Sequence, residues 1–179
     1  MRLSFRRPSG DACSRHPPVA FPGGVGGFGL SWSPVGLVRV AWPGGGEEGP
    51  HARAGEPAWV AALRGRLARH VAGSPQAYGD VVLDDAQLPG FHRRVYRALR
   101  EVPAGMTVTY AGLAALAGSP GAVRAVGQAL ARNPWPLVVP CHRVVAAGGG
   151  AGGFTAPGGL TTKRWLLGME GVALSVTRR

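Results

Sequence analysis

Hydrophobic and polar positions follow two different periods along this chain. Alternation over Phe28–Trp42, broken at Ser33-Pro34, predicts a β-hairpin. Apolar residues four positions apart predict a helix over about 56–71. The apolar run 81–83 predicts a short strand or an extended link. It lies within the Pro-, Gly- and Asp-containing stretch 73–90, which is the best candidate for a linker between two parts of the chain.

The second part shows helical periods separated by clear punctuation. A helix is expected over 91–102, and Thr109 is placed to cap a short helix over 110–117. Ser119 and Pro120 then supply an N-cap and a first-turn proline for a further helix. Two short helices joined by a tight link predict a helix-turn-helix. The second helix is expected to turn three apolar residues toward the core: Val123, Val126 and Leu130.

An apolar run over 135–140 predicts a short buried strand directly before Cys141. A Gly-rich loop follows to Gly159, and the last helix is expected over 161–170. Cys141, His142 and Arg143 thus follow directly after the end of this predicted strand.

Composition limits the class of protein. The chain has 179 residues, 45% of them hydrophobic, which suits one domain or two small ones. No apolar run reaches the roughly 18 residues that a membrane span needs. Two cysteines, Cys13 and Cys141, make neither a disulfide framework nor a zinc-ligand pattern. We therefore expect a cytoplasmic protein with a free thiol, without metal or membrane.

The net charge of +11 points to a polyanion such as nucleic acid, although a genome rich in Arg codons would also produce it. Position separates the two explanations. No Asp or Glu lies within 102–169, a stretch that holds five basic residues and the predicted helix-turn-helix: Arg124, Arg132, Arg143, Lys163 and Arg164. This distribution favours a nucleic-acid face.

The second helix of the pair has a face suited to DNA. Arg124, Gln128 and Arg132 recur every four residues, and small residues such as Ala125 and Ala129 lie between them. Small side chains allow a helix to approach DNA closely. An ordinary solvated face rich in alanine would give the same pattern.

Cys141 stands between Pro140 and His142, with Arg143 next. Nearby positive charge or a proton acceptor makes a thiol a good nucleophile. A buried structural cysteine is the other interpretation of a lone thiol.

Pro140-Cys-His-Arg-Val-Val145 resembles the active-site signature of the DNA–protein cysteine alkyltransferases that repair O6-alkylguanine. The stretch 124–134 is similar to the recognition helix of that family and its Asn hinge. Thr109-Tyr110 and 163–170 fit their places too, so that the resemblance covers about 89–172 firmly.

This resemblance implies a role for each catalytic residue. Cys141 would accept the alkyl group irreversibly, once per molecule. His142 would act as its base through a water, oriented by Glu170. Asn133 would hold the turn beside the active-site segment, and Tyr110 would rotate the target phosphate and protonate the departing guanine.

The resemblance also implies how DNA is bound. Arg124 would fill the space left by the flipped base, while Ala125 and Ala129 would let the helix enter the minor groove. Gln128 and Arg132 share its exposed face. Val144 and Phe154 would shape the guanine pocket; many relatives have Tyr in place of Phe154.

The implied fold is an α/β N-terminal domain over 28–83 and a mainly α C-terminal domain over 89–172. The C-terminal domain would hold a winged-helix-like helix-turn-helix and the active-site cysteine. Residues 1–27 would form a flexible leader and 173–179 a tail. The expected partner is double-stranded DNA containing O6-alkylguanine, bound by a monomer without cofactor.

Two other functions fit parts of the sequence. A non-catalytic protein of the same fold would bind alkylguanine and flag it for other repair, although such relatives lack the cysteine. A cysteine hydrolase would need an oxyanion hole, which the basic surroundings of Cys141 do not favour.

Overall fold

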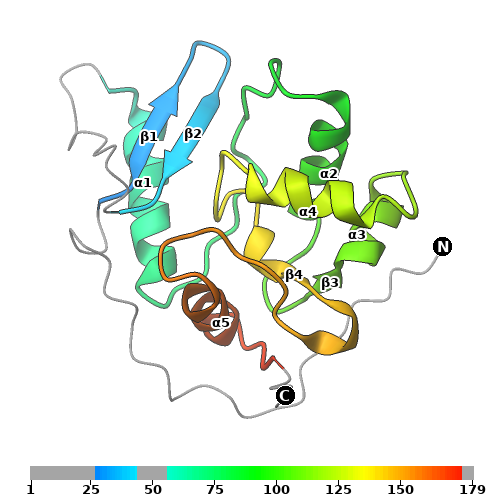
Figure 1. Cartoon of the computed structure of the whole chain (residues 1–179). Helices are drawn as coiled ribbons and strands as arrows, with labels where there is room; N and C mark the ends of the chain where they lie inside the picture. Colours follow the sequence, from blue (N-terminus) through cyan, green and yellow to red (C-terminus); the bar gives the residue numbers. More distant parts are fainter. Residues whose placement is uncertain (1–26, 44–55, 175–179) are drawn as a thin grey trace.

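A computed structural model describes residues 27–43 and 56–174. Figure 1 shows a β-hairpin and helix α1 on one side, helices α2 to α4 on the other, and α5 below them. The predicted leader 1–27 and tail 173–179 lie almost wholly outside the described residues. No helix in the described part is long and apolar enough to cross a membrane.

The predicted hairpin is confirmed. Strands β1 (Gly29–Trp32) and β2 (Leu37–Ala41) are antiparallel, and the backbone N–H of Ser33 donates to the carbonyl of Gly36 to close the turn. A side chain at Gly36 would place its Cβ 2.5 Å from the carbonyl oxygen of Val82. Glycine is therefore required where β2 meets the extended segment 82–84.

Helix α1 (Ala58–Val71) confirms the predicted helix but starts two residues later, after Pro57 at the N-cap. It buries one face: Val60, Leu63, Leu67, His70 and Val71. Trp59, which belongs to the predicted apolar spacing, is 41% exposed and does not belong to that face.

The helices predicted over 91–102 and 110–117 are both present. Helices α2 (Gly90–Arg100) and α3 (Tyr110–Leu116) form as expected, and Thr109 Oγ1 accepts from the backbone N–H of Gly112. An N-cap of this kind contributes about 1 kcal/mol.

Helix α4 (Val123–Ala131) begins later than predicted, and Ser119 does not cap it. The chain forms a turn at Ser119–Ala122. Gly121 in this turn has a φ of 90°, which lies outside the α-helical range, so the helix begins only after it. Val126 and Leu130 face the core as predicted, whereas Val123 is 38% exposed.

The strand predicted over 135–140 does not form. The segment folds into a compact buried turn in which the Val139 N–H donates to the Trp135 carbonyl and Leu137 has a φ of 70°. A short apolar run is equally compatible with any buried conformation, which is why the pattern misled. The local strands are β3 (Val108–Thr109) and β4 (Val144–Val145), which pair in parallel.

Short 3-10 turns and one helix complete the chain. Cys141–Arg143 form η1, Ala147–Gly149 form η2, and Leu160–Met169 form α5.

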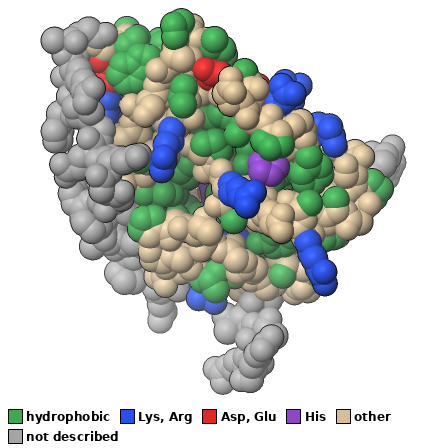
Figure 2. Space-filling view, turned by 45° about the horizontal axis from the view of Figure 1, so that its top comes forward, with side chains coloured by type: hydrophobic (Ala, Val, Ile, Leu, Met, Phe, Trp, Pro, Cys, Tyr) green, Lys and Arg blue, Asp and Glu red, His purple; other side chains and the backbone are tan. Residues whose placement is uncertain are grey.

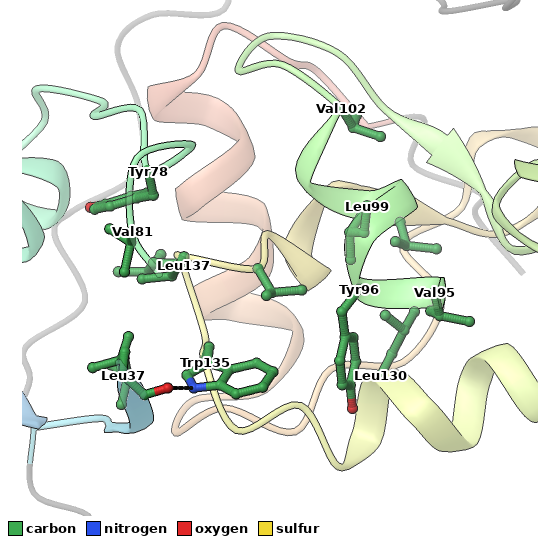
Figure 3. Close-up of a cluster of buried hydrophobic side chains, with 14 of the residues drawn as sticks. Leu37, Tyr78, Val81, Val95, Tyr96, Leu99, Val102, Leu130, Trp135 and Leu137 are labelled. Carbon is green, nitrogen blue, oxygen red and sulfur yellow. Dashed lines mark hydrogen bonds between the residues drawn. The ribbon is translucent and has the colours of Figure 1, made fainter. Parts of the chain in front are cut away.

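A single cluster of buried hydrophobic side chains joins the hairpin and α1 to α2 and α4. In Figure 3, Trp135 lies between Leu37 of β2 and Tyr96 of α2, and its Nε1–H donates to the Leu37 carbonyl at 2.9 Å. Arg100 of α2 also donates to three carbonyl groups of the linker: those of Tyr78, Gly79 and Val81. The core thus crosses the predicted linker.

Candidate active site

Cys141 is the first residue of the 3-10 turn η1. Hydrogen bonds of Asn133, which follows α4, fix the segment that leads to it. The Asn133 side chain donates from Nδ2 to the Val139 carbonyl at 2.9 Å and accepts from the Trp135 N–H at 3.0 Å. The Asn133 side chain is thus hydrogen-bonded to both ends of the buried turn that precedes Cys141. The thiol is free and half-buried.

His142, Arg143 and Glu170 form a buried cluster behind the cysteine. His142 Nε2 lies 3.0 Å from Glu170 Oε1. Arg143 donates from Nη2 to Oε1 at 2.7 Å and from Nε to Oε2 at 3.0 Å. Its Nη1 donates to the Val102 carbonyl, which ties the cluster to the end of α2.

These contacts determine the state of each group. Burial alone would raise the pKa of Glu170, but the hydrogen bonds that it accepts from His142 and Arg143, together with the nearby His70 ring, hold that pKa well below its usual range. A carboxylate only accepts, so His142 places its proton on Nε2. Its Nδ1 then carries a lone pair, and that buried atom has no hydrogen-bond partner among the described residues.

His70, His142 and Glu170 also offer ligand atoms within 4.8 Å of one another, a spacing that a metal site would use. However, Arg143 already donates to both oxygens of Glu170 and places a positive charge beside them. We therefore interpret the cluster as a hydrogen-bond network.

A small cavity opens beside Cys141. Its volume is about 90 Å³, and its lining residues come from α3, α4, η1 and the loop after η2: Tyr110, Gly127, Leu130, Ala131, Cys141, Gly153, Phe154 and Thr155. Tyr110 and Phe154 therefore lie on the wall of the same cavity as Cys141. Val144 does not line this cavity; it is fully buried.

Tyr110 is held at the cavity wall by the Gly153 backbone. Its hydroxyl accepts from the Gly153 N–H at 3.2 Å and donates to the Gly153 carbonyl at 3.4 Å. Burial raises the pKa of Tyr110, so that the phenol keeps its proton at neutral pH.

Lys163 lies fully buried beneath this loop. Its Nζ donates to the carbonyls of Val144 and Gly153, and burial lowers its pKa to about 8. The Nζ is also 5.9 Å from the centre of the Phe154 ring. Lys163 thus joins β4 to the cavity loop.

Burial shifts the pKa values of Cys141 and His142 in opposite directions. It raises the pKa of Cys141, although a hydrogen bond from Asn133 and the charge of Lys163 act in the opposite direction. It lowers the pKa of His142 against the opposing effect of Glu170. At neutral pH Cys141 therefore has a protonated thiol and the residue that follows it has an unprotonated imidazole, which is the protonation state that general-base catalysis requires.

Helix α4 presents part of the predicted DNA-binding face. Arg124, Gln128 and Arg132 are exposed, and Ala125 is partly exposed. Ala129 is fully buried, so the prediction that it lies on the exposed surface is wrong. The buried stripe of α4 is wider than the apolar spacing alone suggests.

The basic residues of the acid-free stretch do not all lie at the surface. Arg143 and Lys163 point inward and serve the cluster and the loop, which corrects their assignment to a charged face. In Figure 2, the exposed Lys and Arg side chains are spread over one face, and acidic ones appear only toward its upper edge.

Sequence reasoning missed three functional candidates: His70, Arg143 and Lys163. The motif around Cys141 and the final helix contained the last two, but only packing shows that they point inward. No local signal marks His70, which comes from α1.

Comparison with known proteins places these residues in context. Residues 90–172 match the family model "6-O-methylguanine DNA methyltransferase, DNA binding domain". A methylated-DNA–protein-cysteine methyltransferase of Methanothermobacter thermautotrophicus is 47% identical over 93 residues, which are 52% of this chain and 51% of that protein. The human protein of the same name is 48% identical over 86 residues, 48% of this chain and 41% of that protein. The chain thus aligns with about half the length of these curated relatives.

A solved structure aligns over more of the chain. The crystal structure of Mycobacterium tuberculosis OGT in complex with DNA has a TM-score of 0.60 and 32% identity. The match covers 80% of this chain and 91% of that one. The similarity therefore extends beyond the segment 90–172.

Proposed function

The chain belongs to the family of 6-O-methylguanine DNA methyltransferases, and we propose that it repairs O6-alkylguanine in duplex DNA by moving the alkyl group to Cys141. One observation carries the proposal. Cys141 lines a cavity, and the next residue, His142, is held by Glu170 at Nε2 and has a free lone pair at Nδ1.

The chemistry proceeds in one displacement. The proton of the Cys141 thiol passes through a water to His142 Nδ1, and the resulting thiolate attacks the alkyl carbon. A sulphur–carbon bond forms while the bond from that carbon to O6 breaks. Tyr110 gives a proton to the departing guanine, whose pair of electrons stays on the base.

The alkylated base is itself the donor, so the reaction needs no cofactor and no metal. The thioether on Cys141 has no route back to a thiol within this site. Each molecule therefore reacts once.

The target oxygen is inside the base stack, and the base must leave the duplex to reach Cys141. In the proposal, α3 and α4 act as the helix-turn-helix of a winged-helix-like domain over 89–172, and α4 enters the minor groove. Arg124 fills the vacated stack, while Gln128 and Arg132 contact the DNA beside it. The exposed position of all three residues supports this role. The protein would act as a cytoplasmic monomer.

The test is the mass of the reacted protein. Incubation with a duplex containing O6-methylguanine should add one methyl group to the tryptic peptide that holds Cys141. Cys141→Ser should abolish the addition, whereas Cys13→Ser, at the other cysteine of the chain, should leave it intact. Methylation of another residue, or more than one equivalent of repaired guanine per protein, would refute the mechanism.

A further inference from the structure

His70 is a fully buried histidine that lies outside the segment matched by the family model and beside the catalytic cluster. It comes from the last turn of α1. Its Nε2 has no hydrogen-bond partner among the described residues, and the acceptor that it faces, at 3.7 Å, is Glu170 Oε1, the same oxygen that contacts His142. The N-terminal part of the chain thus reaches the residue that orients the proposed base.

The surroundings of His70 determine its tautomer. The backbone N–H of Gln76 donates to His70 Nδ1 at 3.2 Å, which requires a lone pair on that nitrogen. The Tyr78 hydroxyl lies 3.1 Å from the same Nδ1. The proton of the neutral ring is therefore on Nε2, directed toward Glu170. A proton on Nδ1 would set that N–H against the N–H of Gln76, so the local geometry favours the tautomer with its proton on Nε2.

Several charged and titratable groups surround His70. Glu170 at the end of α5 faces its Nε2, and His142 lies with ring centroids 6.3 Å apart at 89°. Arg143 contacts the same carboxylate from η1. Tyr78 stacks on the ring from the linker, with the charges of Arg66 and Arg69 acting on that tyrosine from α1.

We propose that His70 is a positioning residue for the site around Cys141, directing its Nε2–H toward Glu170 Oε1. This inference rests on the proposed function and deepens it. Glu170 Oε1 faces His142, His70 and Arg143 at the same time. It therefore stabilises the protonated form of His142 less than a carboxylate that contacted His142 alone would. His70 thereby helps to keep His142 unprotonated and able to accept the thiol proton.

Two substitutions separate the two nitrogen atoms of His70. His70→Gln brings an amide N–H near the place of Nε2 and retains a donor toward Glu170. His70→Asn brings an amide oxygen near the place of Nδ1, which retains an acceptor for Gln76 but removes the donor. Tyr78→Phe is the matched control, because it removes a hydroxyl from the Nδ1 side and leaves the Glu170 side unchanged.

The full-length variants are compared by two measurements. The first is the single-turnover rate of alkyl transfer from a free O6-alkylguanine base against pH. The second is the titration of the His142 ring by NMR, which needs no substrate. In His70→Asn both profiles should move to higher pH by about half a pH unit, which lowers the rate about threefold on the acid side. His70→Gln and Tyr78→Phe should keep the profiles of the unchanged protein.

Identical profiles in His70→Asn and the unchanged protein would overturn the proposal, as would an equal movement in His70→Gln. A third measurement needs no substitution. The nitrogen shifts of His70 should report the tautomer with its proton on Nε2, and a proton on Nδ1 would overturn the proposal. If the unchanged protein accepted no alkyl group, the proposed function would fail, while both NMR measurements would still decide the role of His70.

Discussion

Tyr110 is placed against the cavity by a glycine that faces it. Gly152 has a φ of 67°, and a Cβ there would lie 2.8 Å from Tyr110 Cε2 and 2.9 Å from its hydroxyl oxygen. The neighbouring Gly153 holds that hydroxyl through its backbone N–H and carbonyl. A single methyl group at 152 would therefore move the residue that we propose as the proton donor.

We predict that Gly152→Ala slows alkyl transfer from O6-methylguanine DNA by about tenfold or more, as expected when a proton donor is misplaced. Gly148→Ala is the control, because its φ of 82° brings the same backbone strain while nothing lies within 4 Å of its Cβ. Both variants should lose about 1–2 kcal/mol of unfolding free energy, because each places an alanine at a positive φ. Single-turnover kinetics and thermal unfolding make the comparison. Equal rates in the two variants would remove the positioning role of Gly152.

At the scale of elements, α4 combines two tasks on opposite faces. Its buried face carries Val126, Ala129 and Leu130, and the Tyr96 hydroxyl of α2 donates to the Ala129 carbonyl at 2.7 Å. Its outer side carries Arg124, while Gly127 and Ala131 line the cavity. The same helix is therefore fixed to the core and open to the proposed substrate.

We predict that Arg124→Ala slows reaction with O6-methylguanine in duplex DNA about tenfold more than reaction with the free base. The free base needs no extrusion, so a side chain that fills the emptied stack matters only in duplex. Arg69→Ala removes the same charge from an exposed position on α1, outside the basic stretch 102–169, and should affect both reactions little. Single-turnover rates on both substrates give the ratio, and an equal loss on both would exclude the stack-filling role.

The sequence predicted the elements whose signals are local. The hairpin turn at Ser33-Pro34, the cap at Thr109 and the helices α1, α2 and α5 follow from patterns within each segment. The turn before Cys141 does not, because its shape depends on the Asn133 side chain and on burial from several sides.

The site divides in the same way. The sequence identified Cys141 and His142 because both lie in one contiguous motif, residues 140–145. The inward direction of Arg143 and the arrival of His70 depend on tertiary packing. Contacts between residues of different elements produce no regular spacing in the sequence, so the sequence alone does not predict them.

At the scale of the whole molecule, both sides of the predicted linker 73–90 share one core. The Val40 N–H donates to the Pro134 carbonyl, and Trp135 donates to the Leu37 carbonyl, so β2 is bonded directly to the segment leading to Cys141. His70 makes a third contact across the same boundary. The N-terminal part therefore supports the geometry of the segment that leads to Cys141.

This shared core predicts one cooperative unfolding transition, with Trp135 as a central member. Trp135→Phe removes buried volume and the hydrogen bond to Leu37, and should lower the unfolding free energy by about 2–4 kcal/mol. Trp59→Phe makes the same chemical change at a side chain that is 41% exposed, and should cost under about 1 kcal/mol. Urea unfolding followed by circular dichroism and by tryptophan fluorescence should give coincident curves in both variants. Two separate transitions would mean that the parts fold independently, and equal losses in the two variants would mean that the Trp135 contact does not join them.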